Sequence, residues 1–146
     1  MYYRALNKFM MRNRYHIPHI DYLLHQLKYF YFTKLDFFNG YHHIIITEGD
    51  VWKTASKINQ GLFEWLVIPF GLCNAPSIFM CVRNYVFRTF IYDFVIVYLY
   101  DIIVFGKSWE EHVNHVKLVL DNLKKEKLYV KLSKCEFGKT SLVYLG

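Results

Sequence analysis

A run of apolar residues between Phe94 and Phe105 is interrupted near its middle by one formal charge, Asp101. The run is rich in β-branched and aromatic residues, which favour strands. Apolar residues at successive positions are typical of strands buried on both faces of a sheet. The run therefore predicts two short strands joined by a tight turn at Leu99-Tyr100-Asp101. It is too short to cross a membrane, which takes about 20 apolar residues.

Three other segments have apolar residues at helical spacing. The first is Ile20 to Leu27, and the second begins at Asn74-Ala75-Pro76, where Asn suits a helix cap and Pro suits the first turn. The third begins with the capping-box pattern Ser108-Trp-Glu-Glu111. The stripe that we expect this third helix to bury consists of Val113, Val116, Leu120 and Leu123.

Strand-like segments fill much of the remaining chain. Residues 1–19 indicate an extended arm, because Pro18 disfavours helix at the residue before it. Phe32 to Asp36 is predicted to be a strand that ends in a carboxylate. Further strands are expected at residues 42–47, 53–58, 62–68, 128–132 and 142–145, the second and third of these forming a hairpin. This order predicts an α+β fold with helices packed on one face of a mostly antiparallel sheet.

Composition limits the possible classes of protein. The 146 residues suffice for one domain or a piece of one, and a hydrophobic fraction of 54% excludes a disordered chain. A formal charge of +6 permits a polyanionic partner without establishing one. Cys73, Cys81 and Cys135 have no zinc spacing, so we expect reduced thiols. With no signal-peptide pattern at the start, we expect an intracellular protein without a membrane partner.

Two carboxylates stand out by position. Asp36 ends a predicted strand and Asp101 lies at the hairpin turn. Carboxylates at neighbouring strand ends suit Mg²⁺ and two-metal phosphoryl transfer, although Asp101 is also explained as a turn residue that faces water. His112 and His115 are three residues apart on a helix, without an evident third ligand. We expect them on a solvated helix face.

A series of motifs in order along the chain resembles the reverse transcriptase domain of gypsy-type LTR retrotransposons, whose enzyme is similar to the retroviral one. The resemblance covers essentially the whole sequence. It rests on Tyr3-Arg-Ala-Leu-Asn-Lys8, Phe32-Thr-Lys-Leu-Asp36 with Gly40-Tyr-His42, Lys53-Thr-Ala55, Pro69-Phe-Gly-Leu-Cys-Asn-Ala-Pro76, Glu111-His112 with His115, Ser133-Lys-Cys-Glu-Phe137 and Tyr144-Leu-Gly146.

The resemblance implies a polymerase palm over residues 32–146 and a remnant of the fingers over residues 1–31. It implies that Asp36 and Asp101 bind Mg²⁺ or Mn²⁺, and that template-primer RNA or DNA and deoxynucleoside triphosphates are the partners. The implied nucleotide-binding residues are Arg4, Tyr41, Phe70 and Gly71, with Tyr41 as the gate against a ribose 2′-OH. Lys134 is implied as a phosphate contact or general acid. Core packing equally explains Tyr41 and Phe70, and a solvated basic surface explains Lys134 and Arg4.

The sequence departs from this family at the hairpin turn. The family has two successive aspartates there, and Tyr100 occupies the place of the first. A phenol with a pKa near 10 is mostly neutral at pH 7 and is a poor Mg²⁺ ligand. We therefore expect a degenerate copy without polymerase activity, in which Tyr2 and His16 are further departures. The alternatives are a non-catalytic remnant with no present role and a nucleic-acid-binding module of the RNA-recognition type. The oligomeric state stays open.

Overall fold

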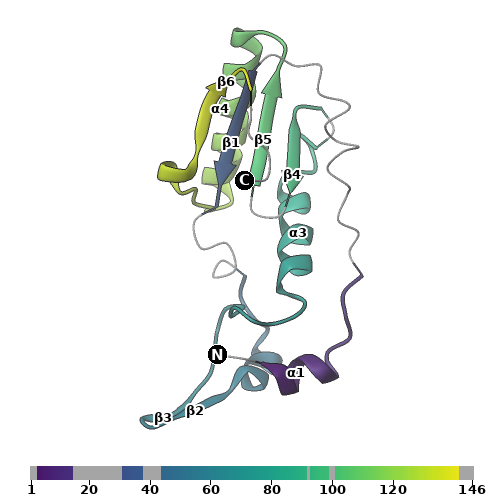
Figure 1. Cartoon of the computed structure of the whole chain (residues 1–146), viewed down its shortest axis with the longest axis vertical. Helices are drawn as coiled ribbons and strands as arrows, with labels where there is room; N and C mark the ends of the chain where they lie inside the picture. Colours follow the sequence, from purple (N-terminus) through teal and green to yellow (C-terminus); the bar gives the residue numbers. More distant parts are fainter. Residues whose placement is uncertain (1–2, 15–30, 38–43, 92, 99–100, 142–146) are drawn as a thin grey trace. The chain divides into compact units, whose positions relative to one another are not determined.

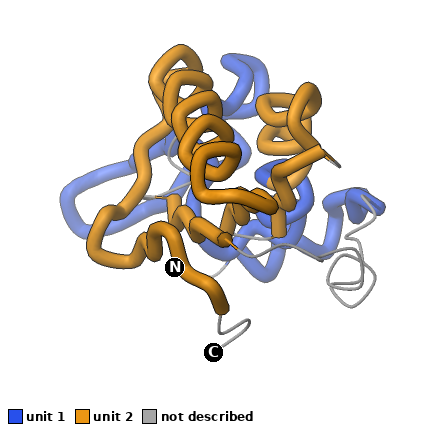
Figure 2. Tube along the Cα trace, turned by 90° about the horizontal axis from the view of Figure 1, so that it is seen from above, with its two compact units in different colours: residues 1–15, 39–79 blue, residues 16–38, 80–146 orange. Residues whose placement is uncertain are grey.

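The structure is a computed structural model, which describes residues 3–14, 31–37, 44–91, 93–98 and 101–141. The chain forms two compact units that interleave along the sequence (Figure 2). The first unit contains residues 1–15 and 39–79, and the second contains residues 16–38 and 80–146. The expected division into fingers and palm at residue 31 stays a prediction.

The second unit is built on a four-stranded antiparallel sheet with the strand order β4-β5-β1-β6 (Figure 1). Its strands are β4 (Val95–Tyr98), β5 (Asp101–Gly106), β1 (Tyr31–Asp36) and β6 (Glu136–Lys139). The predicted hairpin over the apolar run is thus confirmed as β4 and β5, and the predicted strand at residues 32–36 is confirmed as β1. The expected α+β class is confirmed as well.

The two faces of this sheet differ in character. On β1, Thr33 and Leu35 are buried, whereas Lys34 and Asp36, which alternate with them, are only partly buried. This alternation follows from the side-chain period of a strand. The face that carries Lys34 and Asp36 also carries an apolar cluster, which consists of Ile96, Ile103 and Phe105 with Phe32 and Phe94 packed against it.

Helix α4 (Trp109–Lys125) packs on β5 and β1. As its sequence predicts, the Ser108 side chain accepts a hydrogen bond from the Glu111 backbone N–H at 3.2 Å. Glu111 in turn accepts one from the Lys107 N–H at 2.7 Å. The predicted buried stripe is wrong in part: Val113 and Leu120 are 48% and 38% exposed. The residues buried on α4 are His112, Val119 and Leu123.

His112 explains this rotation of the buried face. Its Nε2 lies 2.8 Å from Thr33 Oγ1 on β1, and it is 1% exposed. The same hydroxyl accepts a hydrogen bond from the Gly138 N–H of β6 at 3.2 Å. The expectation of a solvated face for the two histidines is therefore wrong. His115 is partly buried, with its Nδ1 2.8 Å from the Phe105 carbonyl and its ring stacked on Phe94 at 3.9 Å.

Helix α3 (Ala75–Val86) begins where Asn74-Ala75-Pro76 predicts, and its last turns contribute the buried side chains of Met80 and Arg83 to the second unit. The Arg83 guanidinium lies over the Phe37 ring at 4.3 Å. The expected strand at residues 128–132 is wrong in part. Val130 forms only an isolated bridge with Phe37, and a 3₁₀ helix, η3 (Leu132–Lys134), follows it.

The first unit contains α1 (Arg4–Phe9), a 3₁₀ helix η2 (Glu48–Thr54), and the hairpin β2 (Ser56–Ile58) and β3 (Gly61–Phe63). The hairpin was predicted, although its strands are shorter than expected. The expected extended arm is wrong over α1, because the effect of Pro18 reaches only the residue before it. The expected strand at residues 42–47 is reduced, among the described residues, to an isolated bridge between Ile45 and Val67.

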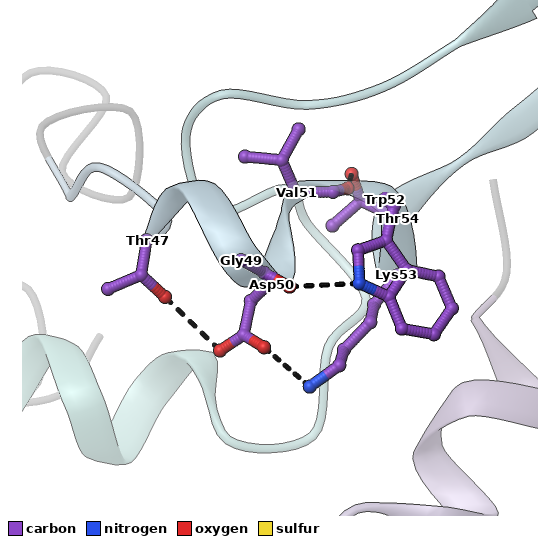
Figure 3. Close-up of polar contacts among 7 residues, drawn as sticks. All are labelled: Thr47, Gly49, Asp50, Val51, Trp52, Lys53 and Thr54. Carbon is purple, nitrogen blue, oxygen red and sulfur yellow. Dashed lines mark hydrogen bonds and ion pairs between the residues drawn. The ribbon is translucent and has the colours of Figure 1, made fainter.

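Polar contacts stabilise η2 (Figure 3). Asp50 pairs with the Lys53 ammonium and accepts a hydrogen bond from the Thr47 hydroxyl at 3.2 Å. Hydrogen bonding to Lys53 and Thr47 keeps the pKa of Asp50 below its ordinary value. The buried Thr54 hydroxyl donates to the Val51 carbonyl at 2.7 Å and accepts from the Trp65 N–H at 2.8 Å. Lys53 and Thr54 of the motif Lys53-Thr-Ala55 therefore stabilise η2 through these contacts.

The predicted helix at residues 20–27 and the predicted strand at residues 142–145 lie outside the described residues, as do Leu99 and Tyr100 of the predicted hairpin turn. Within the part that the structure describes, no helix is both long enough and apolar enough to span a bilayer.

Replacing Gly106 with Ala is expected to destabilise the chain by about 1–3 kcal/mol, the usual cost of overpacking. A Cβ at this position would lie 2.8 Å from the Cα and 2.9 Å from the backbone N of His112, so α4 itself would have to move. Gly49→Ala is the matched control, since nothing lies within 4 Å of a Cβ there. Urea unfolding measures both variants, and equal midpoints would contradict the close approach.

The chain is expected to become less stable as the pH decreases, because His112 is buried in its neutral form. Burial, with a smaller effect from His115, keeps the pKa of His112 below its ordinary value. Below about pH 6.5 the unfolded chain therefore takes up a proton that the native chain does not. The free energy of unfolding should decrease as the pH falls below about 6.5. Above that pH, His112 should cause no further change in it. In the His112→Gln variant, the free energy of unfolding from urea titrations should decrease less over this pH range. If the variant and the parent chain lose stability equally as the pH falls, His112 is not the responsible group.

Candidate functional site

The two candidate carboxylates are brought together by strand pairing. Asp36 ends β1 and Asp101 begins β5, and they lie directly opposite each other in the antiparallel register. Both are partly buried. Side chains at directly opposite positions have Cβ atoms about 5 Å apart and project from the same face. The sheet thus holds two carboxylates side by side at one end of the β1–β5 pair.

Apolar burial fixes this register. The neighbouring pairs are Leu35 with Ile102 and Thr33 with Val104, and all four side chains are buried. A shift of β1 by one residue would turn Thr33 and Leu35 to the other face and bring the charged side chains of Lys34 and Asp36 into their place. The β-branched run of the sequence therefore sets the position of the carboxylates, although it has no chemistry of its own.

Lys34 is the charged neighbour of the pair. Its Nζ lies 3.2 Å from Asp101 Oδ2, and the two side chains are 25% and 29% exposed. Lys34 precedes Asp36 by two residues on β1, so both side chains lie on the same face of the strand. The sequence analysis did not single out Lys34. The signal was present, because a Lys two positions before a strand-end Asp shares its face.

Cys135 lies close to the same two carboxylates. Burial raises the pKa of the Cys135 thiol, the negative charges of Asp36 and Asp101 raise it further, and a hydrogen bond with the Asp36 backbone partly offsets the rise. The thiol donates to the Lys131 carbonyl at 3.3 Å, and the Lys131 N–H donates to the Asp36 carbonyl at 2.8 Å. The segment after α4 is thereby attached to the end of β1.

Lys134 ends η3, one residue before Cys135, and its side chain is exposed. Its backbone N–H donates to the Lys131 carbonyl at 2.8 Å. Lys134 therefore belongs to the segment that is attached to the end of β1. Its implied role toward a phosphate stays a prediction.

Mg²⁺ is commonly bound through one or two carboxylates together with substrate phosphates. A pair of partly exposed carboxylates in register fits a cation that takes its remaining ligands from a substrate. Among the described residues, no three His, Cys, Asp or Glu side chains are grouped so that they could hold a metal ion. The candidate donors for such a cation are therefore Asp36 and Asp101, which face each other across the two strands.

The other candidate residues belong to the first unit or lie outside the described residues. Arg4 lies on α1 and is exposed, Phe70 is 60% exposed, and Gly71 has a positive φ of 100°. Asn7, which the sequence analysis did not select, connects α1 to the segment of Gly71 and Cys73. Its amide donates to the Gly71 carbonyl at 2.8 Å and accepts from the Cys73 N–H at 2.9 Å. Tyr41 and Tyr100 lie outside the described residues.

Similar solved structures include a foamy viral protease-reverse transcriptase in complex with double-stranded DNA, with a TM-score of 0.89 and 25% identity. The match covers 99% of this chain and 25% of that one. A second is the foamy viral protease-reverse transcriptase in complex with an RNA/DNA hybrid, with a TM-score of 0.88 and 25% identity over 99% of this chain and 20% of that one. The four-stranded sheet with its helices therefore has a counterpart in known folds.

Similar curated proteins include the retrovirus-related Pol polyprotein from transposon 297 of Drosophila melanogaster, which is 41% identical over 99% of this chain. The transposon Tf2-3 polyprotein of Schizosaccharomyces pombe is 38% identical over the same share. The chain spans only 14% and 11% of the lengths of these two relatives. Residues 1–146 match the family described as reverse transcriptase (RNA-dependent DNA polymerase). The chain that pairs Asp36 with Asp101 across its sheet therefore belongs to the reverse transcriptase family.

Proposed function

We propose that this chain is the reverse transcriptase domain of a retrotransposon Pol polyprotein, and that its ancestral reaction adds deoxynucleotides to a primer on an RNA or DNA template. The observation that carries the proposal is the in-register pair of Asp36 and Asp101 in a chain of this family. The two polyprotein relatives and the foamy viral structures with bound nucleic acid support the type of parent protein and the class of partner.

In this proposal, Asp36 and Asp101 hold Mg²⁺ or Mn²⁺ at the partly exposed end of the β1–β5 pair. The bound ions supply activation of the primer hydroxyl and stabilisation of charge on the phosphate. The carboxylates orient the ions, and the buried apolar pairs beside them keep the two strands in register. The four-stranded sheet of the second unit belongs to the palm, to which the resemblance assigns residues 32–146.

The remaining roles come from the resemblance. Tyr41, Phe70 and Gly71 shape the nucleotide site, and Arg4 contributes a positive charge to nucleotide or template binding. Lys134 serves the leaving pyrophosphate. The formal charge of +6 is compatible with nucleic acid as a partner, because cationic surfaces attract phosphates.

Tyr100 makes this copy inactive in the proposal. A neutral phenol at the place of a carboxylate removes one donor from the metal site. The pair of Asp36 and Asp101 then has only two carboxylates with which to hold ions that the family binds with three. The alternative of a non-catalytic remnant rests on the same loss of a metal ligand. It is distinguished from a working polymerase domain by whether any primer extension survives.

Restoring the carboxylate should restore catalysis. Residues 1–146 are placed in a complete, active reverse transcriptase of the same family in place of its matching segment. We expect no primer extension by this chimera and an increase of about 10³-fold or more on Tyr100→Asp, since a metal ligand accounts for several kcal/mol of transition-state stabilisation. Labelled-primer extension with Mg²⁺ or Mn²⁺ is the measurement.

The control for this assay is the chimera that carries Asp36→Ala. Extension by the Tyr100 chimera above this control would disprove inactivity. Failure of Tyr100→Asp to extend, in a folded chimera that still binds primer-template, would mean that the lost ligand is not the main lesion, and it would point to the other departures, Tyr2 and His16.

A further inference from the structure

Lys34 contacts one of the two candidate metal ligands, Asp101. It stands opposite Ile103 in the β1–β5 register, so Asp101 is its diagonal neighbour on the next strand. Diagonal neighbours lie within reach of long side chains, and here the ammonium lies 3.2 Å from the carboxylate. Both side chains remain about a quarter exposed, so the ammonium has a path into solvent.

The charge arrangement gives this contact a specific consequence. Asp36 and Asp101 oppose each other directly, and like charges at opposite positions destabilise a strand pair. Lys34 offsets one of these two negative charges. A divalent cation at the same carboxylates would offset both, but it would have to share Asp101 with an ammonium that already occupies one of its oxygens.

We propose that Lys34 is the resident counter-ion of the carboxylate pair, and that a divalent cation binds there only by displacing its ammonium from Asp101. This inference rests on the proposed function, because it takes the pair to be a metal site. Lys34 then has two effects. It stabilises the strand ends when no metal is present, and it lowers the affinity of the site for metal.

The simpler explanation is an ordinary exposed ion pair, which contributes little to stability. The chain contains a matched example of that kind, Lys53 with Asp50 in η2, which belongs to the other unit (Figure 3). Removing either ammonium deletes one positive charge from the chain. Only removal of the Lys34 ammonium should change metal binding at Asp36 and Asp101.

The test is Mn²⁺ binding to the 146-residue chain, with free Mn²⁺ measured by electron paramagnetic resonance. It is run in the Tyr100 chain and in the Tyr100→Asp chain, and Asp36→Asn defines the part of the binding that belongs to the carboxylate pair. Lys34→Met should tighten that binding about three- to tenfold, the effect expected from one partly screened charge. Lys34→Arg and Lys53→Met should leave the dissociation constant within about twofold.

A second readout follows the metal-free state. In chelated buffer, Lys34→Met should lower the thermal midpoint, and saturating Mn²⁺ should raise it by more than it raises that of the parent chain. Lys34→Gln provides a second uncharged variant if the Met variant does not fold.

The outcomes separate the two proposals. If Asp36→Asn changes Mn²⁺ binding in neither chain, the metal site is refuted and the role of Lys34 with it. If Asp36→Asn weakens binding but the uncharged Lys34 variants do not tighten it, the metal site stands and the counter-ion role is overturned. Equal tightening by Lys53→Met would also overturn it, because the effect would then come from net charge.

Discussion

The antiparallel register between β1 and β5 is the constraint on which the rest of the structure depends. The register that joins Asp36 to Asp101 also joins Leu35 to Ile102, so chemistry and burial cannot shift independently. It is locked from the helix side by the His112–Thr33 contact at 2.8 Å, and the Gly138 N–H of β6 binds the same hydroxyl. One polar junction thus connects α4, β1 and β6, three residues along β1 from the carboxylate that we propose binds metal.

The sequence predicted the parts of this fold whose signals are local. The apolar run gave the β4–β5 hairpin, and Ser108 with Glu111 gave the start of α4. It failed where tertiary contacts override the local pattern. The buried face of α4 is centred on His112 because Gly106 allows close approach, and hydrophobicity alone assigns a His to the surface. The short, largely exposed β6 has no alternating apolar pattern, and it exists because β1 offers it an edge.

The candidate site was predictable to a similar extent. Two Asp residues at strand ends predicted a pair, and the structure places Asp36 opposite Asp101. Their partners were missed because each depends on pairing across strands or on a distant segment. Lys34 reaches Asp101 diagonally, and Cys135 lies near both carboxylates only because the segment after α4 is attached to Asp36 by the Lys131 N–H. Periodicity cannot supply such contacts until the register is known.

The groups that hold this fold are separate from the groups that perform the proposed chemistry. Buried pairs such as Leu35 with Ile102, and the junction at Thr33, stabilise the sheet whatever the state of the carboxylates. Opposed carboxylates contribute repulsion, which Lys34 only partly offsets. Losing a further carboxylate from the neighbouring turn therefore removes a donor without removing any of these stabilising contacts. A chain with Tyr100 can therefore keep the fold of its family even if, as we propose, its metal site has lost a ligand, because the contacts that hold the sheet do not depend on that ligand.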